Sequence, residues 1–212
     1  MVAPLTKTSR RMTGSERREQ LIDVAHAVVA QRGFHAVSIE AVAREAGITR
    51  PVVYGHFRDL ADLLEALVER EAARALAQLA TVLPADLAEG DPRELLLAAL
   101  RAYLHVAEAN PATWRLVLMP PEGAPDVLRE RIARGRAAVL AELAHAVRPG
   151  LGPGLGTPDP ELTARALSAI ADEAARMLLS DPARYPAERL LAQARWLLLQ
   201  LPGDGLDQPR QT

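Results

Sequence analysis

Residues 38–59 have the sequence SIEAVAREAGITRPVVYGHFRD, which predicts two short helices joined by a turn at Gly47. A glycine just past a helix end adopts the left-handed conformation that satisfies the last carbonyl groups. Thr49 is placed to cap the second helix through its hydroxyl. Pro51 falls in the first turn of that helix, where a missing N–H costs nothing. This is the pattern of a helix-turn-helix, and it makes nucleic acid the leading partner.

The side chains of this motif separate into an apolar set and a polar set. The small apolar residues that we expect between the two helices are Ile39, Val42, Ala43, Ile48 and Val52. The polar or aromatic residues left to face a groove are Arg44, Thr49, Arg50, Tyr54 and His56. Val53 and Phe57 are expected in the core rather than in contact with a ligand.

The segment before the motif predicts a helix with a clear start and end. Thr13, followed three residues later by Glu16, has the spacing of a capping box. Gly33 ends the helix, and Phe34 is expected to pack at the corner that follows. The apolar face of this helix consists of Leu21, Ala25, Val28 and Val29.

Residues 17–67 resemble the N-terminal DNA-binding domain of the TetR (tetracycline-repressor-like) family of bacterial transcriptional regulators. The residues that carry the resemblance are Arg18, Leu21, Ala25, Gly33, Phe34, residues 38–43 and 46–49, Val53, Tyr54, His56, Phe57 and Asp59. They cover about a quarter of the chain and occur in the order of the family pattern. The resemblance implies an all-α protein of about nine helices. A three-helix helix-turn-helix domain would be followed by a helical ligand-binding and dimerisation domain.

The resemblance also implies which positions contact DNA. They are Arg44, Thr49, Arg50, Pro51, Tyr54, His56 and Arg58. Arg50 is the candidate for reading a guanine edge, whereas Tyr54 either anchors a phosphate or packs between helices. Two positions depart from the family pattern. Leu60 stands where many relatives place a phosphate-binding lysine, a role that Arg58 can take over. Gly55 has no side chain to read a base and lowers helix stability by up to about 1 kcal/mol.

Composition and motifs exclude several classes of protein. The chain has no cysteine, which excludes a disulfide framework, a thiolate metal site and a cysteine nucleophile. It has no His-x-x-x-His pair, Gly-x-Ser-x-Gly motif or Walker loop, and its five histidines lack metal-ligand spacing. We therefore expect no enzyme, no metal and no cofactor. Without a run of 18 apolar residues or a secretory signal, we expect a cytoplasmic protein with no membrane partner.

The net charge of −2 is unevenly distributed along the chain. Residues 1–59 hold nine Lys and Arg against six Asp and Glu, whereas the remaining residues hold sixteen against twenty-one. A basic N-terminal part on an acidic body suits a site-specific DNA binder, because the attraction to phosphate stays local. A balance of this size is also within ordinary scatter, so the charge adds to the motif and does not replace it.

Apolar residues at helical spacing continue through most of the remaining chain. A long helix is expected from Asp59 to about Leu83, where Pro84 ends it. Further helices are expected over about 91–109, 114–118, 126–147, 161–179 and 186–201.

These patterns predict the following organisation. Residues 1–12 form a flexible basic tail, 13–58 the DNA-binding domain, 59–202 the effector-binding and dimerisation domain, and 203–212 a second flexible tail. The Gly- and Pro-rich residues 149–158 form a linker within the larger domain.

Each of the last two helices carries an apolar stripe, and Trp196 and Leu199 make the final helix apolar on more than one face, so that helix must be covered on both sides. Enclosure within one monomer is one explanation. The resemblance implies another, in which these helices pair with their copies in a homodimer. The candidate interface residues are Leu167, Ile170, Ala174, Met177, Leu190, Leu191, Ala194, Leu197 and Leu198. A twofold dimer would present two recognition helices roughly 34–36 Å apart to successive major-groove turns.

The larger domain contains few residues able to orient a ligand. The candidates are Tyr103, His105, Trp114, Arg115, Met119, Asp172 and Glu173, and each is equally compatible with core or solvated surface. The aliphatic surroundings favour a hydrophobic or amphipathic effector.

The function expected from these features is that of a ligand-responsive transcriptional regulator. We expect a repressor that binds a palindromic operator in double-stranded DNA as a homodimer and is released by a small hydrophobic effector. In this mechanism the effector shifts the long helix and changes the separation of the two recognition helices. Gly55 and Leu60 support an alternative, a dimeric regulator of the same fold that acts through protein contacts without specific DNA binding.

Overall fold

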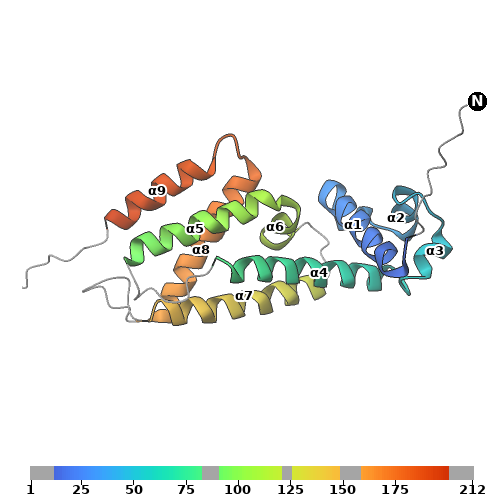
Figure 1. The fold of residues 1–212 in the computed structure, drawn as a ribbon, viewed down its shortest axis with the longest axis horizontal. Helices are drawn as coiled ribbons and strands as arrows, with labels where there is room; N and C mark the ends of the chain where they lie inside the picture. The colour runs from blue at the N-terminus through green and yellow to red at the C-terminus, as the bar shows by residue number, and fades with distance from the viewer. Residues whose placement is uncertain (1–11, 83–90, 121–125, 149–158, 201–212) are drawn as a thin grey trace, which may run out of the picture. The chain divides into compact units, whose positions relative to one another are not determined.

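The computed structural model describes residues 12–82, 91–120, 126–148 and 159–200, and these residues form helices joined by turns (Figure 1). The predicted linker 149–158, the tail 203–212 and the tail 1–12 apart from its last residue lie outside the described residues. Two compact units divide the chain, the first ending at Leu67 and the second beginning at Val68. The boundary between the units therefore lies later in the chain than the predicted boundary after residue 58. The first turns of the long helix, with the fully buried Leu63 and Leu67, belong to the first unit.

The first unit opens with helix α1, Gly14–Arg32. Its start is the predicted capping box: the Thr13 hydroxyl accepts from the Glu16 N–H at 3.2 Å, and the Glu16 carboxylate accepts from the Thr13 N–H at 2.7 Å. The helix ends at Gly33, whose φ of 82° lies in the region that favours glycine. A single 3-10 turn, η1 (Phe34–Ala36), then buries Phe34 at the corner.

Helices α2 (Ile39–Glu45) and α3 (Arg50–Tyr54) form the predicted helix-turn-helix. The Ser38 hydroxyl caps α2 by accepting from the Ala41 N–H at 3.0 Å. The turn between the helices contains Gly47 at a φ of 67°, as predicted.

The predicted hydroxyl cap at Thr49 is wrong, because the structure shows no side-chain cap at the start of α3. Pro51 removes the N–H of the second helical residue, and the N–H of the third, on Val52, donates to the Thr49 carbonyl at 3.0 Å. The Thr49 side chain therefore stays exposed.

The core of the first unit gathers apolar side chains from α1, α2, α3 and the start of the long helix. Its buried members include the predicted Leu21, Ala25, Val28, Val29, Ile39, Val42, Ala43, Val53 and Phe57. Val52 was expected in this core, but 41% of it is exposed. The short α3 has room to bury one of its two valines, and that is Val53.

Helix α4 (Leu60–Ala80) begins in the first unit and continues into the second. The Asp59 carboxylate accepts from the Asp62 N–H at 2.8 Å and so caps its start. The helix ends at Ala80, before the predicted end near residue 83. The N–H groups of Thr81 and Val82 bond to carbonyls three residues back in a tight turn.

The second unit adds five helices in its described residues. They are α5 (Pro92–Ala109), α6 (Pro111–Leu118), α7 (Asp126–Ala146), α8 (Pro160–Ser180) and α9 (Ala187–Leu199). Helix α5 contacts α6, α8 and α9, and α8 also contacts α6 and α7. Figure 1 shows α9 running alongside α5. None of the described helices is both long and apolar enough to cross a membrane.

Two groups of buried side chains hold the second unit together. The larger group joins α4, α5, α6 and α8 through Ala75, Tyr103, Leu104, Ala107, Trp114, Ala175, Leu178 and Leu179. The smaller joins α7 to α8 through Leu143, Val147 and Ala164.

One fully buried carboxylate, that of Glu71, joins α4 to α6. It accepts from the Thr113 hydroxyl at 2.5 Å and lies 3.0 Å from Arg70 and 2.9 Å from Arg74. A buried charge is tolerated only when it is paired and hydrogen-bonded in this way.

Candidate DNA interface and effector cavity

The exposed face of the helix-turn-helix consists mainly of the residues predicted to contact DNA. Arg44, Thr49, Arg50, Pro51 and Tyr54 are all exposed. Tyr54 is 54% exposed, so its ring does not pack between the helices, and this exposure favours a role at the surface. The exposed Val52 adds an apolar group to the same short helix.

Arg50 is held by an ion pair between the two helices of the motif. Its Nη1 lies 2.7 Å from Oε1 of Glu40 in α2. The hydrogen bond between them lowers the pKa of Glu40 and raises that of Arg50, so both groups stay charged at neutral pH. Because both side chains are largely exposed, the pair orients Arg50 but contributes little to stability.

His56 and Arg58 follow α3 and differ in their exposure. The carbonyl of His56 accepts from Nη1 of Arg18 at 2.6 Å, and the same guanidinium lies 4.2 Å above the ring of Phe57. The side chain of Arg58 is 82% exposed, with its Nε 3.5 Å from Asp62. The Arg58 N–H also donates to the Asp62 carboxylate, which lowers the pKa of Asp62. A cation thus stands two residues before Leu60, at the start of α4.

The second unit contains a cavity of about 240 Å³ lined by α4, α5, α6, α7, α8 and α9. Most of the lining is aliphatic, with Leu76, Leu79, Leu97, Leu100, Ile132, Val139 and Leu143 among its members. Polar atoms enter the described lining from Tyr103, Trp114, Arg131, Arg136, Ser168 and Asp172. A mostly apolar hollow with a few convergent polar groups is the usual form of a small-molecule site.

Three of the seven predicted pocket residues line this cavity, namely Tyr103, Trp114 and Asp172. Trp114 is 1% exposed and donates from Nε1 to Oε1 of Gln78 in α4 at 2.8 Å. Its ring meets that of Tyr103 edge to face, with the centroids 5.1 Å apart.

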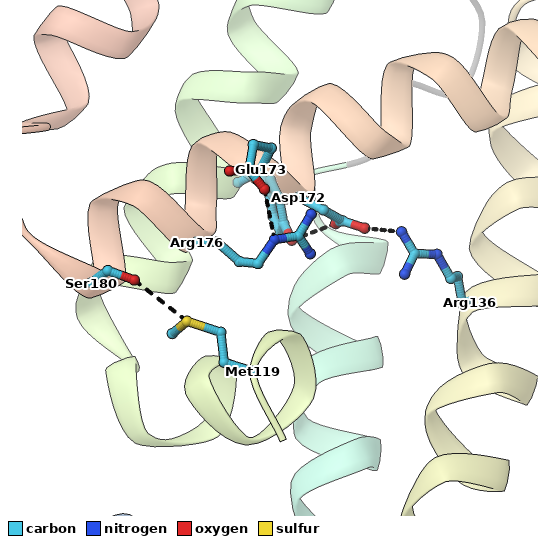
Figure 2. A network of polar contacts seen from close by, with 7 residues as sticks. Met119, Arg136, Asp172, Glu173, Arg176 and Ser180 are labelled. Carbon is cyan, nitrogen blue, oxygen red and sulfur yellow. Dashed lines mark hydrogen bonds and ion pairs between the residues drawn. The ribbon is translucent and has the colours of Figure 1, made fainter. Parts of the chain in front are cut away.

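The other four predicted pocket residues lie outside the lining. Helical periodicity turns three of them away from the cavity, and the fourth, Met119, follows the end of α6. His105 is exposed on α5, and Arg115 donates to the Leu179 carbonyl at 2.9 Å. The Met119 sulfur lies 3.5 Å from the Ser180 hydroxyl. Glu173 pairs with Arg176 at 2.9 Å, as Figure 2 shows.

Asp172 is the centre of the polar network in the cavity (Figure 2). Its Oδ1 accepts from the Tyr103 hydroxyl at 3.0 Å, and its Oδ2 pairs with the Arg136 guanidinium. Burial, followed by the negative charge of Asp172, raises the pKa of Tyr103, so the hydroxyl stays protonated and donates.

The sequence reading missed Arg131 and Arg136 on α7. A signal for Arg136 was present, because it lies four residues after Ile132 and three before Val139, the spacing of one helix face. Both neighbours line the cavity, and Arg136 lines it with them.

The predicted dimer residues fall into three environments. Ala174, Leu190 and Leu191 pack against the core of their own unit, and Met177 is partly buried. Leu167, Ile170, Ala194, Leu197 and Leu198 line the cavity, although Ile170 and Leu197 are also 57% and 47% exposed. On α8 and α9, the large exposed apolar residues absent from the predicted dimer set are Leu162, Trp196 and Leu199.

Comparison with known proteins finds similar sequences and similar structures. Residues 21–67 match the model of the bacterial regulatory proteins of the tetR family. The chain is 30% identical over 111 residues to the HTH-type transcriptional activator FasR of Mycolicibacterium smegmatis, covering 52% of this chain and 49% of that protein. It therefore spans about half the length of this curated relative.

Solved structures extend the likeness to nearly the whole fold. A TetR-like transcriptional regulator from Rhodococcus sp. RHA1 superposes with a TM-score of 0.69 at 23% identity, over 89% of this chain and 97% of that chain. The regulator FadR from Bacillus subtilis, solved in complex with stearoyl-CoA, superposes with a TM-score of 0.63 at 19% identity, over 86% and 97%. The all-α fold with its N-terminal helix-turn-helix is thus shared with these structures, and residues 21–67 carry the N-terminal domain of the tetR family of bacterial regulatory proteins.

Proposed function

We propose that this protein is a ligand-responsive transcriptional regulator that binds a palindromic operator as a homodimer. The observation that carries the proposal is the exposed face of α3, within the segment that matches the family model. Arg50, held by Glu40, is oriented to read a guanine edge, while Tyr54 and Arg58 supply phosphate contacts. Arg58 takes over the phosphate contact of the lysine that many relatives have at the position of Leu60.

The effector in this proposal is an amphipath with a long aliphatic part. Support comes from the cavity, whose lining is mostly aliphatic. A second line of support is the structurally similar FadR of Bacillus subtilis, which was solved with stearoyl-CoA.

Homodimer formation through α8 and α9 is supported by the apolar residues exposed there, Leu162, Ile170, Trp196, Leu197 and Leu199. Every residue of α9 keeps some exposure although the helix is rich in leucine. Exposed apolar side chains gathered on two helices indicate a surface that is covered in solution.

Helix α4 is the proposed link between effector and operator. It begins in the unit with the helix-turn-helix, and its later turns supply Ala72, Ala75, Leu76 and Leu79 to the cavity lining. An effector that displaces this helix changes the separation of the two α3 helices in a dimer. By linkage, operator DNA weakens effector binding by the same factor.

The first experiment is a fluorescence-anisotropy titration against duplex DNA from the region upstream of the protein's own gene, with a scrambled duplex as control. We expect tight binding that prefers the natural duplex and weakens steeply between two salt concentrations. The Arg50→Ala variant should show a weaker preference for the natural duplex. Equal binding to both duplexes at both salts by wild type and variant would favour the second candidate, a regulator that acts through protein contacts. Gly55 and Leu60 are the observations on its side.

The proposed sign of regulation is repression relieved by the effector. The similar protein of Mycolicibacterium smegmatis is named an activator, so the assay must score both signs. A promoter fusion carrying the bound duplex should show higher expression when the regulator's gene is deleted. Lower expression on deletion would make the protein an activator.

A further inference from the structure

Polar groups of the cavity concentrate at one place, where α5, α7 and α8 meet. Tyr103, Arg136 and Asp172 come from these three helices, and Asp172 bonds to the other two. Figure 2 shows its pairing with Arg136. Elsewhere the described lining is mainly aliphatic. A ligand with one polar end and one long apolar part is therefore oriented by this cluster.

Exposure decides which member of the cluster an incoming headgroup meets first. The side chain of Arg136 is 47% exposed, whereas that of Asp172 is 12% exposed. Both oxygens of Asp172 are occupied, one by the Tyr103 hydroxyl and the other by the guanidinium. Arg136 has five N–H donors, and among the described residues Asp172 is its one acidic partner.

Charge in the lining points the same way. The charged side chains of the described lining are Arg131, Arg136 and Asp172, a balance of one positive charge. Glu69, which pairs with Arg131, is not part of the lining. A cationic headgroup would have to compete for a carboxylate that is already paired, in a lining that also carries two guanidinium groups. An anionic headgroup meets unused donors.

We propose that the cavity selects amphipaths with an anionic headgroup, which Arg136 binds, and that Asp172 sets the strength of this selection by opposing the same charge. The inference rests on the proposed effector function and names the ligand class of that site. A carboxylate or phosphate accepts two parallel N–H bonds from a guanidinium, so Arg136 suits either headgroup. Asp172 keeps the guanidinium in place, and its negative charge weakens the binding of the incoming anion.

Three ligands with the same alkyl chain test the proposal: dodecanoate, dodecanol and dodecyltrimethylammonium. Calorimetric titration of the full chain, below the concentration at which each ligand forms micelles, gives their affinities. The wild type should bind dodecanoate about tenfold more tightly than dodecanol, because a hydrogen bond to a charged group is worth that much or more. Dodecyltrimethylammonium should bind more weakly than dodecanol.

Two substitutions at the cluster separate the roles of its members. Arg136→Gln should remove the preference for dodecanoate and leave the affinity for dodecanol within about twofold. Asp172→Asn retains an oxygen that can accept from Tyr103 and Arg136 but removes the charge. It should therefore raise the affinity for dodecanoate several-fold without changing that for dodecanol. A dodecyl phosphate titration then distinguishes a carboxylate site from a general anion site.

The matched control is Arg134→Gln, because Arg134 lies on the same helix, is exposed and is not part of the lining. This variant should retain the full preference. Circular dichroism identifies any variant that has lost its fold. Arg136→Lys keeps the charge without the planar fork and should fall between wild type and Arg136→Gln.

Two results would overturn the inference while leaving effector binding intact. They are equal affinity of wild type for dodecanoate and dodecanol, or tighter binding of dodecyltrimethylammonium that Asp172→Asn abolishes. Failure of all the alkyl ligands to bind would instead remove the amphipathic effector of the proposed function, and this inference with it.

Discussion

The two units build their candidate sites in opposite ways. In the first, the groups that face solvent come from neighbouring positions on α3 and from Glu40, ten residues before Arg50. In the second, Tyr103 reaches Asp172 across 69 positions of sequence, and Trp114 reaches Gln78 across 36. The first site is a set of exposed side chains on the surface of a packed core. The second is a hollow in the core itself, so its recognition and its stability depend on the same side chains.

The largest expected effect is that of Trp114→Ala. Trp114 is 1% exposed, contacts Tyr103 and bonds to Gln78, so its removal should cost about 3–5 kcal/mol of unfolding free energy. Denaturant unfolding measures the change. Trp114→Phe keeps most of the apolar volume and should cost clearly less. A loss of unfolding free energy below about 1 kcal/mol for the alanine variant would show that Trp114, and with it this wall of the cavity, is not packed in the core.

Arg50→Ala should affect DNA binding strongly and stability hardly at all, the reverse of what is expected at Trp114. We expect specific operator binding to weaken by about 1–3 kcal/mol, with preference relaxed at one position in each half-site. Because Arg50 is exposed, unfolding free energy should change by no more than about 0.5 kcal/mol. Competition with duplexes altered at single positions measures the first quantity and denaturant unfolding the second. Tyr54→Phe should weaken all duplexes alike, and a loss confined to one sequence would contradict its role as a phosphate contact.

Gly47→Ala tests how far the helix-turn-helix depends on local backbone conformation. The φ of Gly47 is 67°, and no atom beyond its chain neighbours lies within 4 Å of an added Cβ. The cost should therefore be conformational alone, about 1–2 kcal/mol, measured by thermal unfolding. Gly33→Ala should cost more, since its Cβ would also meet Nδ1 of His35 at 3.1 Å. Equal costs at the two positions would contradict this account.

The Tyr103 hydroxyl predicts a loss of stability at alkaline pH. Its pKa is raised in the folded protein by burial and by Asp172. The stabilisation is therefore complete below the unfolded pKa of about 10 and is lost as pH rises above it, by about 1.4 kcal/mol per pH unit. Denaturant midpoints measured between neutral pH and pH 11 report the slope. Tyr103→Phe should remove this contribution, and an unchanged slope in that variant would assign it elsewhere.

The smallest effect is expected from Arg58→Gln. The side chain of Arg58 is 82% exposed, so stability should hardly change. If it contacts a phosphate, the dependence of log affinity on log salt should become shallower by about one unit for all duplexes. Arg165→Gln, an exposed arginine on α8, serves as the control and should leave the slope unchanged. An unaltered slope for Arg58→Gln would show that Arg58 does not replace the phosphate-binding lysine that many relatives have at position 60.

Features that depend on near neighbours could be read from the sequence. The capping box of Thr13 and Glu16 needs two side chains three residues apart, and the turn at Gly47 needs one residue that tolerates a positive φ. Thr49 shows the limit of such reading, because Pro51 removes one of the two N–H groups that a hydroxyl cap can use, and the other, on Val52, donates to the Thr49 carbonyl.

The amino-acid order alone was enough to specify an all-α chain, its helix-turn-helix and the cluster of exposed polar residues on α3, since these follow from periodicity, caps and turns over a few residues. Three-dimensional packing settled that Val53 is buried and Val52 exposed, and that Arg136 lines the cavity while His105 does not. It also paired Asp172 with Tyr103 and Arg136. These outcomes depend on which helices meet and at what rotation. That depends on the summed burial of side chains far apart in sequence, which no local pattern records.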